Sequence, residues 1–188
     1  MFRCPVSDLA ELRILEIHHA EAFFELAQRN RAYLRPWLPW VDATHAVDDT
    51  RRFIEQGLRQ FAANEGFQAG LWHQGVPAGV LGLHRIDWAN RAVSLGYWLD
   101  QASQGRGLMT AAVKAVVGHL FDELDLHRIE IRAAVENRKS RAIPERLGFQ
   151  LEGILRQAQR SGGCYLDLAV YSLLRSDPQQ GTSGRPDT

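Results

Sequence analysis

Hydrophobic and polar residues follow two different periods along this chain. From Arg128 to Val135 apolar residues alternate with charged ones, which predicts a strand with one buried face. Between Met109 and Leu124 apolar residues recur every three or four positions, which predicts an amphipathic helix. The mostly apolar stretch from Ala92 to Leu99 predicts a strand just before that helix. The same patterns predict strands at 9–15, 67–72, 76–83, 149–159 and 165–174, and helices at 19–30, 50–62 and 140–147.

The order of these elements predicts their topology. A strand, a helix and a strand follow one another from 92 to 135, which predicts a right-handed βαβ unit with parallel strands. The turn at Gln74-Gly75 joins two strands into an antiparallel hairpin. Either Asp48 or Asp49 is expected to cap the helix that follows it. The chain is therefore expected to adopt an α/β fold.

Two segments do not fit a regular element. Residues 33–40 form an aromatic segment interrupted by prolines, which excludes a regular helix there. The segment from Ser176 is rich in Pro, Gly, Gln, Ser and Thr, so we expect residues 176–188 to form a disordered tail. Residues 1–175 contain no repeat and no linker, and we expect them to form one domain.

Composition narrows the class of protein. Lys and Arg together number 22 and so do Asp and Glu, so no overall charge favours direct binding of nucleic acid or of a membrane surface. Cys4 and Cys164 are far apart and belong to no motif, which is typical of a reducing compartment. The histidines are scattered, so we expect no metal site. No signal peptide or long apolar run is present, and we expect a cytoplasmic protein.

The glycine-rich turn from Gln104 to Gly107 is the strongest chemical signal. It lies between a strand and a helix, where glycines permit close approach and the helix N-terminus offers free N–H groups to a phosphate. A tight strand-to-helix turn without a ligand is the alternative. The spacing does not match a dinucleotide fingerprint, because Thr110 stands where the third glycine would be, and no P-loop motif is present.

This turn resembles motif A of the GCN5-related N-acetyltransferases (GNAT family), which reads Q/R-x-x-G-x-G/A. Here the stretch is Gln104-Gly105-Arg106-Gly107-Leu108-Met109, with Met109 in place of the usual small residue. Residues 136–149 resemble the family's N-x-x-S…LGF block, and a Leu-Glu-Gly stretch follows at 151–153. The Trp-Leu-Pro-Trp segment at 37–40 is similar to that of the RimJ/RimL-type subgroup, which acetylates N-termini of ribosomal proteins.

The resemblance extends over residues 9–174 and implies a fold and a cofactor. The fold is a mostly antiparallel twisted sheet with one parallel, splayed strand pair and helices on both faces. The cofactor is acetyl-CoA, whose pyrophosphate lies on the glycine turn and whose pantetheine arm enters the splay. The residues implied to bind it are Trp98, Leu99, Gln104, Gly105, Arg106, Gly107, Leu108, Met109, Thr110, Asn137, Ser140 and Arg141.

The resemblance also implies direct attack of an amine on the thioester. Many relatives carry a tyrosine as thiolate donor where Pro144 stands here, so Ser140 is the expected catalytic replacement, unless it only caps a helix. A glutamate base of some relatives corresponds to Gln159, which cannot accept a proton. His84, Asp87 or a water chain are the alternatives, and His84 is the expected catalytic base.

The implied acceptor is a protein N-terminal α-amine, as in ribosomal proteins. A small-molecule amine, or a non-catalytic protein that only senses acyl-CoA, are the alternatives. Relatives often form homodimers, although no interface is visible in this sequence. The candidates for acceptor binding are Trp37, Trp40, Asp87, Gln159 and Tyr165.

Overall fold

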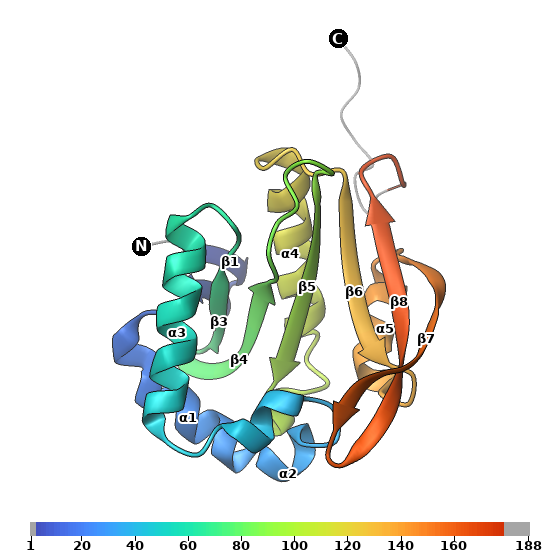
Figure 1. The fold of residues 1–188 in the computed structure, drawn as a ribbon. Coiled ribbons are helices and arrows are strands. Elements are labelled where there is room, and N and C mark those ends of the chain that lie inside the picture. The colour runs from blue at the N-terminus through green and yellow to red at the C-terminus, as the bar shows by residue number, and fades with distance from the viewer. Residues whose placement is uncertain (1–2, 179–188) are drawn as a thin grey trace.

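A single eight-stranded sheet organises the chain in a computed structural model that describes residues 3–178 (Figure 1). Its strand order is β1-β2-β3-β4-β5-β6-β8-β7. All neighbours are antiparallel except β5 and β6. Most of the expected tail, residues 179–188, lies outside the described residues. The strands are Arg3–Ser7 (β1), Ala10–Ile14 (β2), Gln68–His73 (β3), Val76–Leu83 (β4), Ala92–Leu99 (β5), Arg128–Ala134 (β6), Gln150–Ser161 (β7) and Cys164–Leu174 (β8).

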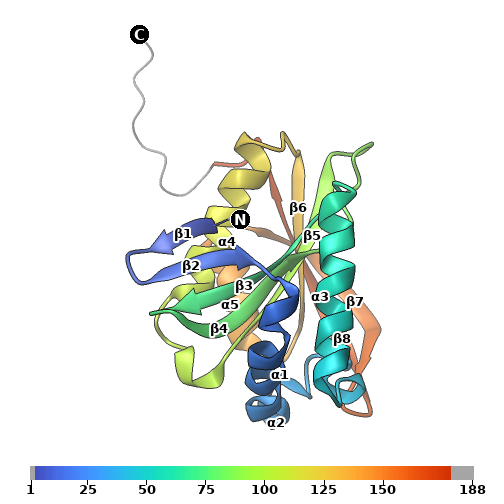
Figure 2. The ribbon, with the colours of Figure 1, turned by 90° about the vertical axis from the view of Figure 1, so that its left-hand side faces the viewer.

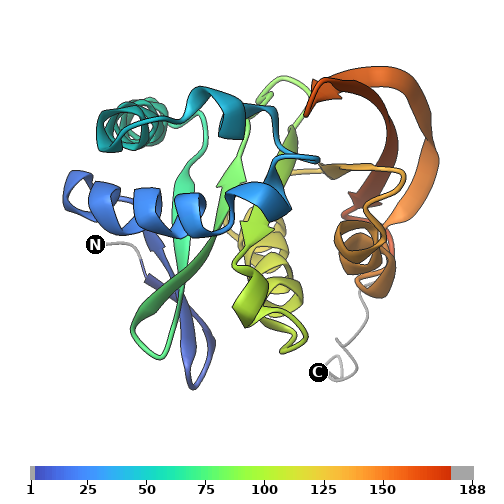
Figure 3. The ribbon, with the colours of Figure 1, turned by 90° about the horizontal axis from the view of Figure 1, so that it is seen from below.

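Helices cover both faces of this sheet, as Figures 2 and 3 show. Helices α4 and α5 lie on one face, and α1 and α3 lie on the other, with α2 at one end of the molecule. The larger hydrophobic core packs α4 against the strands, and a smaller core lies under α1 and α3. The predicted α/β fold with helices on both faces is confirmed. The helices are Ala20–Arg29 (α1), Arg31–Leu34 (α2), Val47–Ala62 (α3), Leu108–Asp122 (α4) and Arg138–Arg146 (α5).

Strands β5 and β6 form the predicted parallel pair around α4, but they pair over only part of their length. The pairing runs from Ala92 with Arg128 to Leu95 with Ile131 and then stops. Both strands continue beyond that point, and they diverge toward their carboxyl ends (Figure 1). A gap therefore opens in the middle of the sheet, beside the N-terminus of α4.

Side chains of β5 alternate between the two faces of the sheet at this gap. Tyr97 and Leu99 pack against the core under α4, whereas Trp98 packs against the smaller core under α1 and α3. This alternation is the period of two that a strand imposes. A molecule lying in the gap can therefore reach side chains from both faces.

The structure corrects three local predictions. Strand β1 was not expected, because its alternation of Cys4 and Val6 with exposed residues covers only five positions and includes a proline. Helix α3 begins at Val47, and the carboxylate of Asp49, inside the first turn, accepts hydrogen bonds from the N–H groups of His45 and Ala46. Helix α5 begins at Arg138, so Asn137 rather than Ser140 is its N-cap.

A buried polar cluster ties α1 to the end of β5. Asn30 is 3% exposed, and its amide donates to Asp100 Oδ1 at 2.7 Å and to the Leu26 carbonyl at 2.8 Å. Its carbonyl oxygen accepts the N–H of Gln101 at 2.9 Å. Asp100 is 5% exposed and also accepts from Ser103. The cluster fixes the chain that leads into the glycine turn.

Replacing Asn30 with alanine should therefore destabilise the protein. We expect Asn30→Ala to lower the free energy of unfolding by about 1–3 kcal/mol, because it leaves Asp100 buried with fewer donors. Urea denaturation measures this change. Asn90→Ala is the matched control, since Asn90 is exposed and bonds to the exposed Asp87, and it should change stability by less than about 0.5 kcal/mol. Equal effects of the two substitutions would contradict the role of the cluster.

Candidate active site

A cavity of about 1750 Å³ occupies the gap between β5 and β6. It extends from the glycine turn before α4, past the carboxyl ends of both strands, to the segment around Trp37 and Trp40. Most of the predicted site residues line it, although they come from six different regions of the chain. The predicted residues on its wall are Trp37, Trp40, His84, Trp98, Leu99, Gln104, Gly105, Gly107, Leu108, Met109, Thr110, Asn137, Ser140 and Gln159.

The glycine turn is shaped for close approach by a ligand. Gly105 and Gly107 have φ angles of +74° and +71°, a region that other residues rarely adopt. A Cβ at either position would meet no atom within 4 Å and would instead enter the open space. Gly107 is also the N-cap of α4, so the N–H groups of the first helical turn face the cavity without helical acceptors. The turn can hold an anion of the size of a pyrophosphate.

Cationic side chains surround this turn, although sequence reasoning did not single them out. Lys139 Nζ lies 2.9 Å from Gln104 Oε1, and Arg146 Nη1 lies 3.1 Å from Thr110 Oγ1. The amide of Gln104 donates to the hydroxyl of Tyr33, so Gln104 links α2 to α5. The predicted Arg106 is exposed and does not line the cavity. Lys139 and Arg146 thus place positive charge on the cavity wall beside the turn.

Backbone groups of β5 face the gap with a period of two. The N–H of Asp100 donates to the Ala78 carbonyl in the direction of β4, so Trp98, two residues earlier, also directs its backbone to β4. The backbone groups of Tyr97 and Leu99 then point toward β6, where the pairing has already ended. An extended ligand arm in the gap therefore meets the backbone groups of Tyr97 and Leu99. Of Trp98 it can meet only the side chain.

Helix α5 presents its first turn to the gap. Asn137 Oδ1 accepts the N–H of Ser140 at 3.2 Å, which caps the helix, and both residues line the cavity. The carbonyl of Ser140 accepts the hydroxyl of Tyr97 at 2.9 Å. Since Asn137 performs the capping, the Ser140 hydroxyl is not needed for it.

Arg141, which the resemblance assigned to the cofactor, has structural partners instead. Its Nε donates to the hydroxyl of the buried Tyr171 at 2.8 Å, and its Nη1 donates to the Val135 carbonyl at 3.0 Å. The Tyr171 hydroxyl in turn donates to Glu145 at 2.6 Å. Arg141 does not line the cavity. It anchors α5 on β8.

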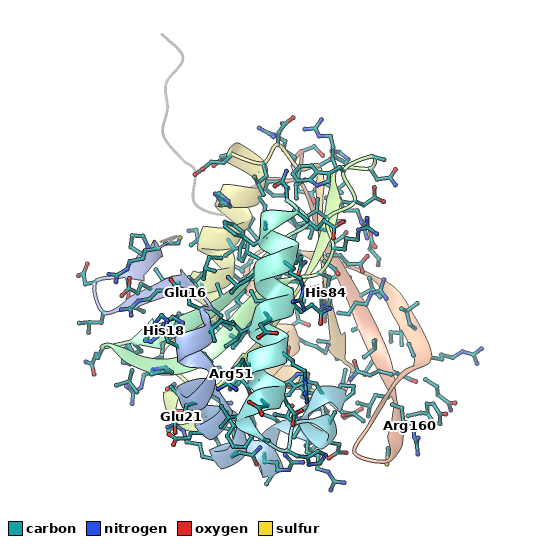
Figure 4. The ribbon with its side chains drawn as sticks, turned by 60° about the vertical axis from the view of Figure 1, so that its left-hand side comes forward. Glu16, His18, Glu21, Arg51, His84 and Arg160 are labelled. Atoms are coloured by element: carbon teal, nitrogen blue, oxygen red, sulfur yellow. The ribbon has the colours of Figure 1, made fainter. Side chains whose placement is uncertain are left out.

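His84 is the titratable base candidate on the cavity wall, and it lies beside α3 (Figure 4). Its Nδ1 is 2.8 Å from Ser94 Oγ. His84 is partly exposed, and its partial burial lowers its pKa below the ordinary 6.5. The nearby Arg132 lowers this pKa further, against the opposite effect of Glu130. The imidazole is therefore neutral at pH 7 and able to accept a proton.

The other end of the cavity is closed by two segments far apart in sequence. Gln159 Nε2 on β7 donates to the Trp37 carbonyl at 2.7 Å, and Ser161 donates to the Arg35 carbonyl at 2.8 Å. The rings of Trp40 and Trp98 lie 5.8 Å apart. Through this hydrogen bond, Gln159 bridges β7 and the Trp37 segment on this wall of the cavity.

Two further predicted residues, besides Arg106 and Arg141, stand away from the cavity. Tyr165 is 65% exposed and does not line it. Asp87 is exposed and accepts hydrogen bonds from the N–H and side chain of Asn90, which lower the pKa of its carboxyl. Neither side chain is on the cavity wall.

Tyr33, Tyr97, Lys139 and Arg146 contribute to the site but were not predicted. Tyr97 lies in the same strand as Trp98, and the period of two could have identified its backbone as facing the parallel neighbour. Lys139 and Arg146 belong to the block at 136–149, yet their approach to the glycine turn depends on how α5 packs.

Two observations concern other kinds of site. Within residues 3–178, no helix is long and apolar enough to cross a membrane. In the same part of the chain, no three His, Cys, Asp or Glu side chains gather in a way that could hold a metal ion.

The glycine turn before α4 and the splayed parallel strands define an acyltransferase-type site on this sheet. Residues 10–150 match the profile of the acetyltransferase (GNAT) domain family. The chain therefore belongs to the GNAT family of acetyltransferases, and the predicted family membership is confirmed.

Relatives of known name are similar along almost the whole chain. YdaF of Bacillus subtilis, which carries the provisional name of a ribosomal N-acetyltransferase, is 39% identical over 94% of this chain and 97% of its own. The ribosomal-protein-serine acetyltransferase of Escherichia coli is 28% identical over 89% of this chain and 93% of its own. The RimJ/RimL-type subgroup is thus the part of the family that this chain resembles.

Solved structures agree with this assignment. RimL, a ribosomal L7/L12 α-N-protein acetyltransferase in complex with coenzyme A, superposes with a TM-score of 0.89 at 31% identity and covers 92% of this chain and 98% of its own. The microcin C7 self-immunity acetyltransferase MccE, in complex with acetyl-CoA and AMP, has a TM-score of 0.86 at 29% identity, with 90% and 94% covered.

A carboxylate placed in the glycine turn should prevent binding of a phosphate ligand. We expect Gly107→Glu to weaken the affinity for coenzyme A by at least about 100-fold, because it adds bulk and a like charge beside the pyrophosphate. Isothermal titration calorimetry measures the Kd. Gly118→Glu makes the same change in α4 but away from the cavity wall, and it should leave the Kd within about twofold. An unchanged Kd for Gly107→Glu, in a folded variant, would exclude the turn as the binding site.

Proposed function

We propose that this protein transfers an acetyl group from acetyl-CoA to the N-terminal α-amine of a protein, in the manner of the ribosomal-protein acetyltransferases. The observation that carries the proposal is the open gap between β5 and β6, which joins the glycine turn to the Trp37 and Trp40 segment in one cavity. Such an acceptor implies action in the cytoplasm, where ribosomal proteins are made.

The cavity has the donors that coenzyme A requires. The N–H groups at the start of α4 suit the pyrophosphate, and Lys139 and Arg146 add positive charge beside it. The backbone groups of Tyr97 and Leu99 suit the amide groups of the pantetheine arm. Bound acetyl-CoA supplies the activated thioester, and one of these N–H groups can stabilise charge on its carbonyl oxygen.

Two side chains have the chemistry for the proton transfers. His84, neutral at pH 7, is the proposed general base that takes the proton from the attacking amine. Ser140, at the start of α5 on the opposite side of the gap, is the proposed donor to the departing thiolate. Gln159, at the position of a glutamate base in some relatives, binds the Trp37 carbonyl and has no role in the proton transfers.

The charge of the cavity wall favours an acceptor with one amine over a polyamine. Asp49 is the one acidic residue among the described residues on the wall. Its carboxylate already accepts the N–H groups of His45 and Ala46 and pairs with Arg52. No carboxylate on this wall is therefore free to bind the several cations of a polyamine or an aminoglycoside.

The decisive experiment compares acceptors under one set of conditions. We expect mass spectrometry to show acetylation of peptides that begin with Ser or Ala, the residues in the names of the relatives. The same peptides with a blocked N-terminus and an internal lysine are the control and should not react. If only spermidine or an aminoglycoside were acetylated, the acceptor would be a small-molecule amine and not a protein N-terminus. Binding of coenzyme A without acetylation of any amine would indicate a non-catalytic sensor.

The role of His84 predicts a specific pH dependence. A base with a lowered pKa stays active down to a pH below 6.5 and loses activity only as the pH falls through that pKa. We expect the ratio of kcat/KM between the wild type and His84→Gln to be constant above pH 7, at roughly 10²–10⁴, and to decrease in acid. The ratio cancels the titration of the acceptor amine, which both enzymes share.

Ser94→Ala serves as the control for this measurement. It removes the hydrogen-bond partner of His84 but leaves the imidazole, so the acid limb should persist with a shifted midpoint. A ratio for His84→Gln that does not change with pH would assign the base to another group or to water.

A further inference from the structure

Helix α5 contains a proline in its interior, and this proline removes one backbone donor. Pro144 is the seventh residue of a helix that begins at Arg138. In a regular helix the N–H of residue 144 would donate to the carbonyl of Ser140, four residues earlier. Proline has no N–H, and its ring crowds that same carbonyl. The carbonyl of Ser140 therefore needs a different donor.

The side chain of Tyr97, on strand β5, provides that donor. Its hydroxyl donates to the Ser140 carbonyl at 2.9 Å, across the gap between β5 and α5. The ring packs against the main core, and burial raises the pKa of the Tyr97 hydroxyl well above its usual range. The hydroxyl thus stays protonated and remains a donor at neutral pH.

This hydrogen bond holds the half of α5 that borders the cavity. Elsewhere α5 is held by side-chain contacts: Arg141 and Glu145 contact the Tyr171 hydroxyl on β8, and Lys139 and Arg146 bond to the segment at the start of α4. The contact of Tyr97 instead reaches the backbone of the first turn, where Asn137 and Ser140 line the cavity. It lies where β5 and β6 no longer pair, so no sheet hydrogen bond can replace it.

We propose that Tyr97 is a positioning residue, which substitutes for the backbone donor that Pro144 lacks and so fixes Ser140 at the reacting centre. The catalytic part of this proposal rests on the proposed function, because it assumes that Ser140 acts in acetyl transfer. The structural part, the replacement of a helix donor by a tyrosine hydroxyl, stands without it.

A double-mutant cycle tests both parts. In Pro144→Ala the N–H of residue 144 is restored and can donate to Ser140, so the Tyr97 hydroxyl becomes dispensable. We expect Tyr97→Phe alone to lower kcat roughly three- to tenfold, the range for loss of one hydrogen bond, with the KM for acetyl-CoA within about twofold. In the Pro144→Ala background the same substitution should lower kcat by less than about twofold.

Tyr171→Phe is the matched control. It removes the other tyrosine hydroxyl that contacts α5, through Arg141 and Glu145 rather than through a backbone carbonyl. Restoring the N–H of residue 144 should not reduce its effect. An equal loss of kcat for Tyr97→Phe in both backgrounds, or a change in KM alone, would overturn the positioning role.

A second measurement on the same variants does not depend on activity. Hydrogen exchange of the α5 amides should become faster in Tyr97→Phe, and this increase should disappear in the double variant. If the wild type acetylates no N-terminal peptide but exchange follows this pattern, the proposed function fails while the structural part stands. If Tyr97→Phe leaves exchange unchanged, the proposal on Tyr97 fails whatever the acceptor.

Discussion

The end of pairing between β5 and β6 is the constraint on which the site depends. After Leu95 and Ile131 the strands diverge, and the backbone groups of Tyr97 and Leu99 lose the partners that a continuous sheet would supply. Backbone polar groups away from water are nearly always paired, so this edge favours a ligand that can act as an additional strand. A gap in the middle of a sheet also connects its two faces, so a donor bound beside α4 can meet an acceptor beside α3.

Such a gap is stable only if the elements around it are held from elsewhere. The buried pair of Asn30 and Asp100 fixes the chain between β5 and the glycine turn. Tyr171 anchors α5 on β8, and Tyr97 connects α5 back to β5. Gln159 joins the hairpin of β7 and β8 to the Trp37 segment. Each of these bonds uses a polar side chain to hold an element that borders the gap.

The predicted elements agree with the structure where one period dominates. The β5–α4–β6 unit and the glycine turn were predicted because their apolar residues face one continuous core. Strand β1 was missed because its two-residue alternation covers only five positions and none of them is fully buried. The resemblance assigned Arg141 and Arg106 to the cofactor, but Arg141 contacts Tyr171 and Arg106 is exposed. A charged side chain near a motif can point toward the cavity or away from it, and the sequence does not specify which.

The sequence by itself determined the βαβ unit, the glycine turn before the helix and the resemblance to an acetyltransferase family. These properties depend on local backbone preferences and on periods within single elements. Only the tertiary structure decided which charges surround the turn, that the His84 side chain lines the gap and that the Tyr97 hydroxyl donates to the Ser140 carbonyl. The contact of Tyr97 with Ser140 spans 43 residues, and that of Gln159 with Trp37 spans 122. Contacts at such separations arise from packing, which local sequence patterns do not specify.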